Sequence, residues 1–327
     1  MTLAIIGGGA FATALAHLVA GRGGEVHLWT DDAALAEEIA TRRTHARRLP
    51  GLEIHPGVRA SSDLAAVVRA ARLLLLAVAS PRVPDVVRAL GAVTDGRHLL
   101  VHAIGAPVTL PGGGTRVAEL VSRETSIKRV GVLAGPALAR DLLERKPAAV
   151  IAASAFDEVV SRSRAAIEVP GVLRVYGSHD LIGVELASAI SGAMTIALGL
   201  ADGLGLGPGP RAVLLTRCVA EGTRLSVAAG ARERTFGGLA GLGNLLVRAT
   251  PGGDRSDDYQ LGVSLARGLP IERRETEGTR AAAAALKLAR RLGTRVPILE
   301  AVCAVVHEGV PVPQAAARLQ ETAADEE

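Results

Sequence analysis

A short run of small residues near the start of the chain could hold the phosphate groups of a ligand. Gly7 permits a tight turn, Gly9 lets a pyrophosphate approach bare backbone, and Ala12 is small enough for a helix to pack closely on a strand. A helix that begins here also directs unpaired backbone N–H groups at the phosphates. Asp31 follows about 20 residues later, where an acid can bind the hydroxyls of an adenosine ribose. This spacing predicts a dinucleotide site whose contacts in the run are Gly7, Gly9, Ala10, Phe11 and Ala12.

The segments around this run have the order that a dinucleotide-binding unit requires. Residues 2–6 are an apolar run of strand length, residues 13–19 place apolar side chains on one helical face, and residues 25–29 alternate like a second strand. A glycine-rich turn that binds nothing is the alternative, because a glycine motif alone is weak evidence. The Asp31 carboxylate would repel a 2′-phosphate, so we expect NAD rather than NADP as the cofactor.

Further apolar segments extend this start into a larger fold. Segments of strand length recur at residues 58–60, 73–78, 98–103, 130–133 and 148–153. Strand signals stop at about Asp180, and Glu185 to Leu200 and three later segments have helical length. We therefore expect an α/β Rossmann-type N-terminal domain over residues 1–178 and an all-α C-terminal domain over residues 179–320. Residues 321–327 are expected to form an acidic, frayed tail.

The composition narrows the class of partner. The chain has 327 residues, of which 49% are hydrophobic and 21% charged, so it can bury large cores. Its net charge of +4 suits an anionic partner, but dispersed arginines and only 2% aromatic residues argue against a nucleic-acid platform. We therefore expect a small anionic ligand. Only three of the 37 basic residues are lysines, namely Lys128, Lys146 and Lys287.

Nothing in the sequence indicates a metal site, an export signal or a membrane segment. Cys218 and Cys303 lie in apolar helical stretches without metal-ligand spacing, and we expect both to be reduced thiols. The N-terminus lacks a basic region before its apolar residues. We find no uninterrupted apolar run of about 18 residues. The expectation is a cytoplasmic protein.

Several segments resemble a known enzyme family. They are Arg174-Val175-Tyr176, Asp180 to Leu186, Ala201 to Gly205, Thr235 to Gly243, Gly135-Pro136 and Glu277 to Arg280. Together they are similar to bacterial-type NAD(P)-dependent glycerol-3-phosphate dehydrogenases, and the resemblance covers essentially the whole chain. It implies a Rossmann domain followed by an all-helical domain, and a homodimer.

The resemblance implies a reaction whose main catalytic groups are replaced here. The family reduces dihydroxyacetone phosphate to glycerol 3-phosphate, and an acid or a cation must accept the charge that builds on the ketone oxygen. It uses a Lys-Asn pair in a long central helix and a second lysine after the fifth strand. An ungapped registration from Glu185 to Gly203 puts Ser191 and Gly192 at the Lys-Asn pair, and Ile104 stands at the second lysine.

Further differences affect the same set of residues. Asn244 stands at a family aspartate and Arg248 at a nearby threonine, and the phosphate-binding Ser-Arg-Asn segment reads Asp254-Arg255-Ser256. The positions that correspond to catalytic residues are Ser191 and Asn244. The implied substrate contacts are Ile104, Gly135, Ala137, Arg248, Asp254, Arg255 and Ser256. Ala139, Arg255 and Glu277 are further expected coenzyme contacts. Ser80, Ile104 and Gly135 are also expected at the rim of the coenzyme cleft, because ligands of an open α/β sheet bind at the carboxyl ends of its strands.

Three side chains could replace the missing catalytic groups, and each also has a purely structural interpretation. His102 could donate a proton close to the nicotinamide, or it could simply pack at a strand end. Ser191 could bind a ligand or pack within its helix. Arg248 could bind a carboxylate or phosphate with its planar guanidinium, or face solvent.

Losing a general acid typically slows a reaction by about 10²–10⁴-fold. Two functions are therefore open. The first is a dehydrogenase with weak activity on the family substrate or with a different substrate. The second is a non-catalytic protein that senses NAD(H) or presents a surface to an unknown protein partner.

Overall fold

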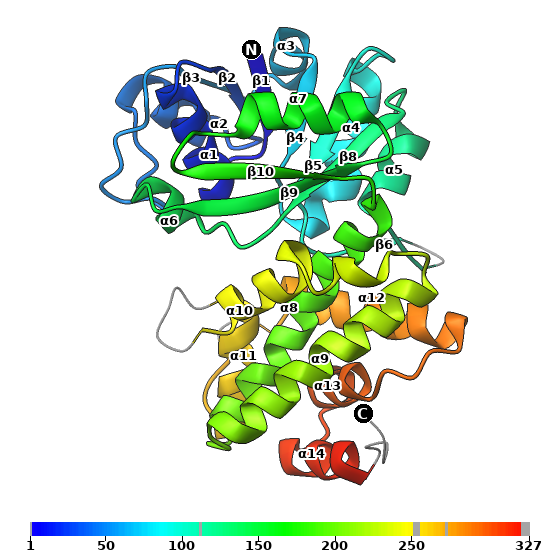
Figure 1. The fold of residues 1–327 in the computed structure, drawn as a ribbon. Helices are drawn as coiled ribbons and strands as arrows, with labels where there is room; N and C mark the ends of the chain where they lie inside the picture. The colour runs from blue at the N-terminus through cyan, green and yellow to red at the C-terminus, as the bar shows by residue number, and fades with distance from the viewer. Residues whose placement is uncertain (1, 111–112, 251–255, 272–273, 322–327) are drawn as a thin grey trace. The chain divides into compact units, whose positions relative to one another are not determined.

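Figure 1 shows the computed structural model of the chain, which describes residues 2–110, 113–250, 256–271 and 274–321. The chain divides into two compact units. The first consists of Met1–Ile104 and Thr115–Leu181, and the second consists of Gly105–Gly114 and Ile182–Glu327.

The first unit is built on an eight-stranded sheet in the order β10-β9-β8-β5-β4-β1-β2-β3. Its strands are β1 (Thr2–Ile6), β2 (Glu25–Trp29), β3 (Val58–Ser61), β4 (Leu73–Leu76), β5 (Leu99–His102), β8 (Arg129–Ala134), β9 (Ala148–Ser154) and β10 (Leu173–Ser178). All neighbouring strands pair in parallel except β8 and β9, which are antiparallel. The continuous apolar runs of β4 and β5 are buried along their whole length, as in parallel sheets covered on both faces. The expected Rossmann-type fold is confirmed.

Helices connect these strands, and local sequence explains where two of them begin. They are α1 (Ala10–Gly21), α2 (Ala33–Glu37), α3 (Leu64–Ala70), α4 (Val83–Val93), α5 (Val117–Glu124), α6 (Ala139–Leu143) and α7 (Asp157–Ile167). Asp32 caps α2 by accepting the Leu35 N–H at 3.1 Å. Asp63 caps α3 in the same way, accepting the Ala66 N–H at 3.0 Å.

Two strand regions have no counterpart among the predicted strands. β10 lies at the edge of the sheet and buries Leu173 and Val175 while Arg174 and Tyr176 remain exposed or nearly so. In β10 apolar residues therefore occur at every second position, whereas in the central strands they are nearly continuous. The second region is the two-stranded sheet of β6 (Val108–Leu110) and β7 (Gly113–Thr115), whose glycines weaken any strand signal.

Arg22 stabilises the C-terminal end of α7. Its guanidinium donates hydrogen bonds to the carbonyls of Ala165, Ala166 and Glu168 at 2.6, 2.5 and 2.6 Å. These carbonyls have no partner within the helix, and a positive charge also complements the helix dipole there.

We expect Arg22→Met to lower the free energy of unfolding of the first unit by about 1–2 kcal/mol. Arg59→Met is the matched control, because the Arg59 side chain makes an exposed ion pair with Glu25 and such pairs contribute little. Urea unfolding monitored by circular dichroism measures both changes. Equal stability losses in the two variants would contradict this role for Arg22.

The second unit is mainly helical. Its helices are α8 (Leu181–Gly203), α9 (Pro208–Ala228), α10 (Asn244–Arg248), α11 (Asp257–Arg267), α12 (Glu277–Leu292), α13 (Pro297–His307) and α14 (Val312–Glu321). Buried α8 crosses α11 at glycines, since a Cβ on Gly199 would lie 2.4 Å from the Tyr259 carbonyl oxygen. A Cβ on Gly262 would likewise lie 2.3 Å from the Ile196 carbonyl oxygen. Close backbone approach requires glycine at both positions.

The long helix α8 has 23 residues and a mean hydropathy of 1.8 over an 18-residue window. By length and composition it could cross a membrane, although polar residues such as Glu185 and Ser188 interrupt its apolar run. Of this window, 89% is buried inside the structure, as in the central helix of a helical domain.

Glu221 on α9 caps the buried start of α13. Pro297 has no N–H to offer, and both carboxylate oxygens of Glu221 accept the next N–H groups, those of Ile298 and Leu299, at 2.9 Å each. Burial raises the pKa of Glu221 from its ordinary 4.5 to about 7, although these hydrogen bonds oppose the shift.

This pKa shift predicts a pH-dependent stability. Between pH 4.5 and 7 the folded protein retains a proton on Glu221 that the unfolded chain has released. The free energy of unfolding should therefore fall by roughly 3 kcal/mol as the pH rises through this window. Glu221→Gln should remove that loss, whereas Glu308→Gln, at the exposed other end of α13, should not. Urea unfolding at pH 5 and pH 8 tests this, and equal slopes in wild type and Glu221→Gln would contradict it.

Candidate coenzyme cleft and polar cluster

At one position of the glycine-rich loop, the protein's own packing does not require glycine. Gly7 has a φ of +140°, and a Cβ there would lie 2.2 Å from the Ala77 carbonyl oxygen. A Cβ on Gly8 would lie 2.7 Å from Thr30 Oγ1. A Cβ on Gly9 would meet nothing within 4 Å and would project into open space. Glycine at this position therefore leaves room for a ligand, which fits the pyrophosphate of a dinucleotide.

A cleft of about 620 Å³ opens above this loop within the first unit. Its lining includes the run from Gly7 to Ala12, the residues Ala77 to Ala79 after β4, and Asp31 at the end of β2. Gly9 is the N-cap of the 12-residue helix α1 and offers no capping side chain, so the first N–H groups of the helix remain available to an anion. These residues fit a dinucleotide coenzyme.

The acid at the end of β2 already has a basic neighbour. Asp31 Oδ2 lies 2.6 Å from Arg82 Nη2, and Arg82 belongs to the segment that follows β4. Three further arginines, Arg42, Arg47 and Arg48, line the same cleft. Sequence spacing predicted Asp31 but missed Arg82, because no local pattern links residues that far apart.

A buried histidine forms a hydrogen bond between the loop that contains Arg47 and Arg48 and the glycine-rich loop. His45 is 1% exposed, and its Nε2 lies 3.0 Å from the Gly8 carbonyl oxygen. A carbonyl only accepts, so Nε2 carries the proton. Glu38 also stabilises the loop, since its Oε1 accepts hydrogen bonds from Thr44 Oγ1 and the Ala46 N–H.

Other predicted residues of the first unit are not among those that line the cleft. Ser80 and Ile104 are buried, and a Cβ on Gly135, with φ +142°, would lie 2.9 Å from the Ala149 carbonyl oxygen. Ala137 and Ala139 are half-buried. Their roles as ligand contacts stay predictions.

His102 is packed at a strand end. It is 1% exposed, and its Nδ1 accepts the Ile104 N–H at 3.5 Å. Of the two alternatives from the sequence, this geometry favours packing over proton donation.

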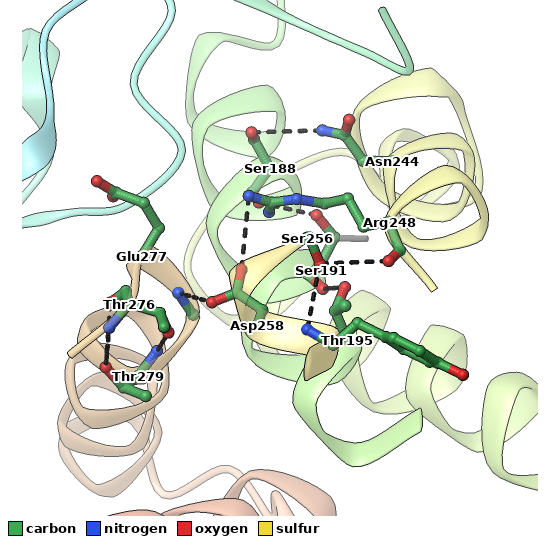
Figure 2. A network of polar contacts seen from close by, with 12 residues as sticks. Ser188, Ser191, Thr195, Asn244, Arg248, Ser256, Asp258, Thr276, Glu277 and Thr279 are labelled. Carbon is green, nitrogen blue, oxygen red and sulfur yellow. Dashed lines mark hydrogen bonds and ion pairs between the residues drawn. The ribbon is translucent and has the colours of Figure 1, made fainter. Parts of the chain in front are cut away.

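The second unit contains a polar cluster at the positions that the sequence predicts to correspond to the family's catalytic residues (Figure 2). Ser191 is fully buried, and its Oγ donates to the Ser188 carbonyl within α8 at 2.8 Å. Asn244 donates from Nδ2 to the Ala240 carbonyl at 3.1 Å and lies 3.5 Å from Ser188 Oγ. Ser191 thus satisfies its hydroxyl within its own helix.

Arg248 extends across α8, with its guanidinium between Ser188 and Asp258 (Figure 2). Its Nη2 lies 3.5 Å from Oδ2 of Asp258, which is 2% exposed and also accepts the Gly278 N–H at 2.8 Å. A Cβ on Gly192 would lie 2.9 Å from Arg248 Nη1. The guanidinium therefore occupies space that any side chain at position 192 would need.

Some of the remaining predicted ligand contacts of the second unit are described by the structure and others are not. Asp254 and Arg255 lie outside the described residues. Ser256 is the N-cap of α11, since its Oγ accepts the Tyr259 N–H at 3.2 Å and donates to the Arg248 carbonyl. Glu277 begins α12 and lies 3.4 Å from Arg280 Nη2.

None of the three lysines contributes to the polar cluster. Lys128 donates to the Ser122 carbonyl, and Lys146 pairs with Asp141 and Glu144, all in the first unit. Lys287 is the single lysine of the second unit and is exposed on α12. Within the described part of the chain, no group of three or more His, Cys, Asp or Glu residues could hold a metal ion.

Comparison with known proteins identifies the family. Residues 2–160 match the family model of the NAD-dependent glycerol-3-phosphate dehydrogenase N-terminus, and residues 180–317 match that of its C-terminus. This chain belongs to that family. A glycerol-3-phosphate dehydrogenase [NAD(P)+] of Nitratidesulfovibrio vulgaris strain DP4 is 37% identical over 317 residues, covering 94% of each chain. The enzyme of the same name from Streptomyces coelicolor is 36% identical over 318 residues, covering 94% of this chain and 92% of the relative.

Solved structures support the same family. The crystal structure of glycerol-3-phosphate dehydrogenase from Coxiella burnetii superimposes with a TM-score of 0.89 at 28% identity, covering 98% of both chains. The structure of the enzyme from Saccharomyces cerevisiae, at 18% identity and a TM-score of 0.84, shares the fold. The activity of the family is that of an oxidoreductase with a nicotinamide coenzyme.

Proposed function

We propose that this chain is a nicotinamide-dependent oxidoreductase in which the guanidinium of Arg248 replaces the family's lysine ammonium groups, so that activity on dihydroxyacetone phosphate is weak. The observation that carries this proposal is the position of Arg248. Its Nη1 lies against Gly192, which follows Ser191 at the first lysine position, and its Nη2 would lie 4.0 Å from a Cβ on Gly105 of the same unit.

This replacement has a direct chemical consequence. A bound nicotinamide coenzyme would supply the hydride for reduction of a ketone. Arg248 can stabilise negative charge on the ketone oxygen, but a guanidinium group keeps its proton in proteins and cannot give that oxygen a proton. Charge stabilisation without general acid catalysis leaves the reaction slower by about 10²–10⁴-fold.

A steady-state assay tests the proposed function. Purified protein is mixed with NADH or NADPH and dihydroxyacetone phosphate, and absorbance of the reduced coenzyme is followed. We expect coenzyme binding by calorimetry with turnover far below about 1–10³ s⁻¹, the usual range for enzymes. Turnover within that range would overturn the proposed degeneracy. Coenzyme binding without turnover of any ketone would favour the second candidate, a non-catalytic NAD(H) sensor, which the buried Ser191 hydroxyl also favours.

We further propose NAD(H) as the preferred coenzyme, with discrimination against NADPH weakened by Arg82. The Asp31 carboxylate would repel a 2′-phosphate, but its ion pair with Arg82 offsets part of this repulsion. Both side chains are about half exposed, so solvent limits the effect.

We expect Arg82→Gln to increase the preference for NADH over NADPH by about tenfold, since it exposes the Asp31 charge. Arg88→Gln is the matched control, because Arg88 lies on α4 and pairs with Asp85 rather than with Asp31. Dissociation constants for both coenzymes measure the effect. An unchanged ratio in Arg82→Gln would show that Arg82 does not influence coenzyme choice.

We propose a cytoplasmic homodimer that binds a small anionic ligand and neither nucleic acid nor membrane. The two cysteines support a reducing compartment, because both are free and burial raises their pKa values, that of Cys303 to about 12.

A further inference from the structure

The charges around Arg248 do not suit a doubly charged phosphate group. Asp258, with its buried carboxylate, pairs with Arg248, and Arg280 at the start of α12 lies 3.9 Å from Glu275 and 3.4 Å from Glu277. Counted over these described side chains, two guanidinium groups face three carboxylates. Among these described side chains each guanidinium is already paired with a carboxylate, and a dianion needs more positive charge to compensate it than a monoanion does.

The guanidinium itself suits a flat monoanion. Among the described residues Arg248 makes one ion pair, through Nη2, and no side-chain hydrogen bond, so most of its five donors are available. Its side chain is 23% exposed. The planar N–H donors of a guanidinium, held in a fixed fork, match the two oxygens of a carboxylate. A phosphate dianion carries more charge but does not fit this fork better.

Asp258 positions this fork. Its Oδ1 accepts the Gly278 N–H at the start of α12, and its Oδ2 faces Arg248 Nη2. A Cβ on Gly278 would lie 2.6 Å from Asp258 Oδ1, so both Gly192 and Gly278 are needed for the arrangement. Figure 2 shows Asp258 between Arg248 and the first turn of α12.

We propose that the natural substrate of this site is a small 2-oxo monocarboxylate, bound through Arg248, rather than a phosphorylated ketone. This inference rests on the proposed oxidoreductase function. The C2 carbonyl of the acid accepts a hydride at carbon and a proton from water at oxygen, giving a 2-hydroxy acid, while NADH is oxidised to NAD⁺. Arg248 is the specificity-determining residue and Asp258 is a positioning residue.

The test compares two matched ketones and two anions that do not react. Hydroxypyruvate and dihydroxyacetone phosphate each carry a hydroxymethyl ketone and differ in the anionic group. We expect kcat/KM with NADH to be at least about tenfold higher for hydroxypyruvate, and oxamate to bind more tightly than inorganic phosphate. Equal or better performance of the phosphorylated ketone and of phosphate would overturn the proposal.

Variants separate the role of Arg248 from a loss of folding. Arg248→Met should weaken oxamate binding by about 10- to 100-fold and leave phosphate binding unchanged. Because it strands the Asp258 carboxylate, the double variant Arg248→Met with Asp258→Asn serves as the folded comparison, and Arg291→Met, at the exposed end of α12, is the matched control. Unchanged oxamate affinity in the double variant would overturn the role of Arg248.

Measuring anion binding with and without NADH distinguishes the preference for a carboxylate from the proposed oxidoreductase function. Oxamate binding that depends on Arg248, without oxidation of NADH by any ketone, would support the carboxylate site and count against the oxidoreductase function. Turnover of dihydroxyacetone phosphate alone would support the oxidoreductase function and overturn the carboxylate preference.

Discussion

Restoring the family's catalytic groups is expected to raise the reduction of dihydroxyacetone phosphate by about 10²–10⁴-fold, the usual contribution of general acid and charge stabilisation. The variant combines Ser191→Lys, Gly192→Asn, Asn244→Asp and Arg248→Thr with Ile104→Lys. Its two introduced lysines would supply ammonium groups that can both stabilise the alkoxide and donate a proton, which Arg248 cannot.

The structure requires that Arg248 be removed in the same variant. An asparagine at position 192 would collide with the guanidinium, because its Cβ would lie 2.9 Å from Arg248 Nη1. That Cβ would also lie 3.5 Å from Asp258 Oδ2, so the new amide can donate to the carboxylate that loses its arginine. Without Arg248→Thr, the ammonium group introduced by Ser191→Lys would also be placed beside another cation.

The three-residue variant Ser191→Lys, Ile104→Lys and Asn244→Asp is therefore the control. It retains Arg248 and should gain less than about a tenth of the activity of the full variant. Oxidation of NADH measures both rates, and circular dichroism verifies folding. A folded full variant with wild-type activity would show that the pocket has lost more than its lysines.

Gly9→Val should weaken coenzyme binding by about 100-fold while the protein remains folded. The new side chain would project into the open space above the glycine loop, where a pyrophosphate would approach the first turn of α1. The backbone at Gly9, with φ −75° and ψ 167°, accepts any residue. Loss of the preferred N-cap should lower Tm by only a few degrees.

Gly96→Val is the matched control for this substitution. A Cβ on Gly96 also meets nothing within 4 Å, but Gly96 does not line the coenzyme cleft. Calorimetric titration with NADH and thermal unfolding together separate binding from stability. If Gly9→Val binds NADH as wild type does, the cleft above the glycine loop is not the coenzyme site.

Local sequence was sufficient for the elements that build the coenzyme cleft. The strand at residues 2–6, the glycine turn and the helix after it follow one another directly, and each has an unambiguous pattern. The strands β4 and β5 were equally clear because burial on both faces makes β4 wholly apolar and β5 apolar up to His102. β10 was missed because an edge strand alternates buried and exposed residues and is easily taken for a loop.

What the sequence by itself determined was the family, because its motifs recur along essentially the whole chain. The replacement of lysine at positions 104 and 191 is a prediction from the same motifs. Only the tertiary structure decided which charged groups lie beside the predicted site residues. Arg82 reaches Asp31, and Arg248 lies over Gly192 beside Asp258, across separations of about 50 or more residues for two of these contacts. Such pairs depend on how helices and strands pack, and helical or strand periodicity carries no information about them.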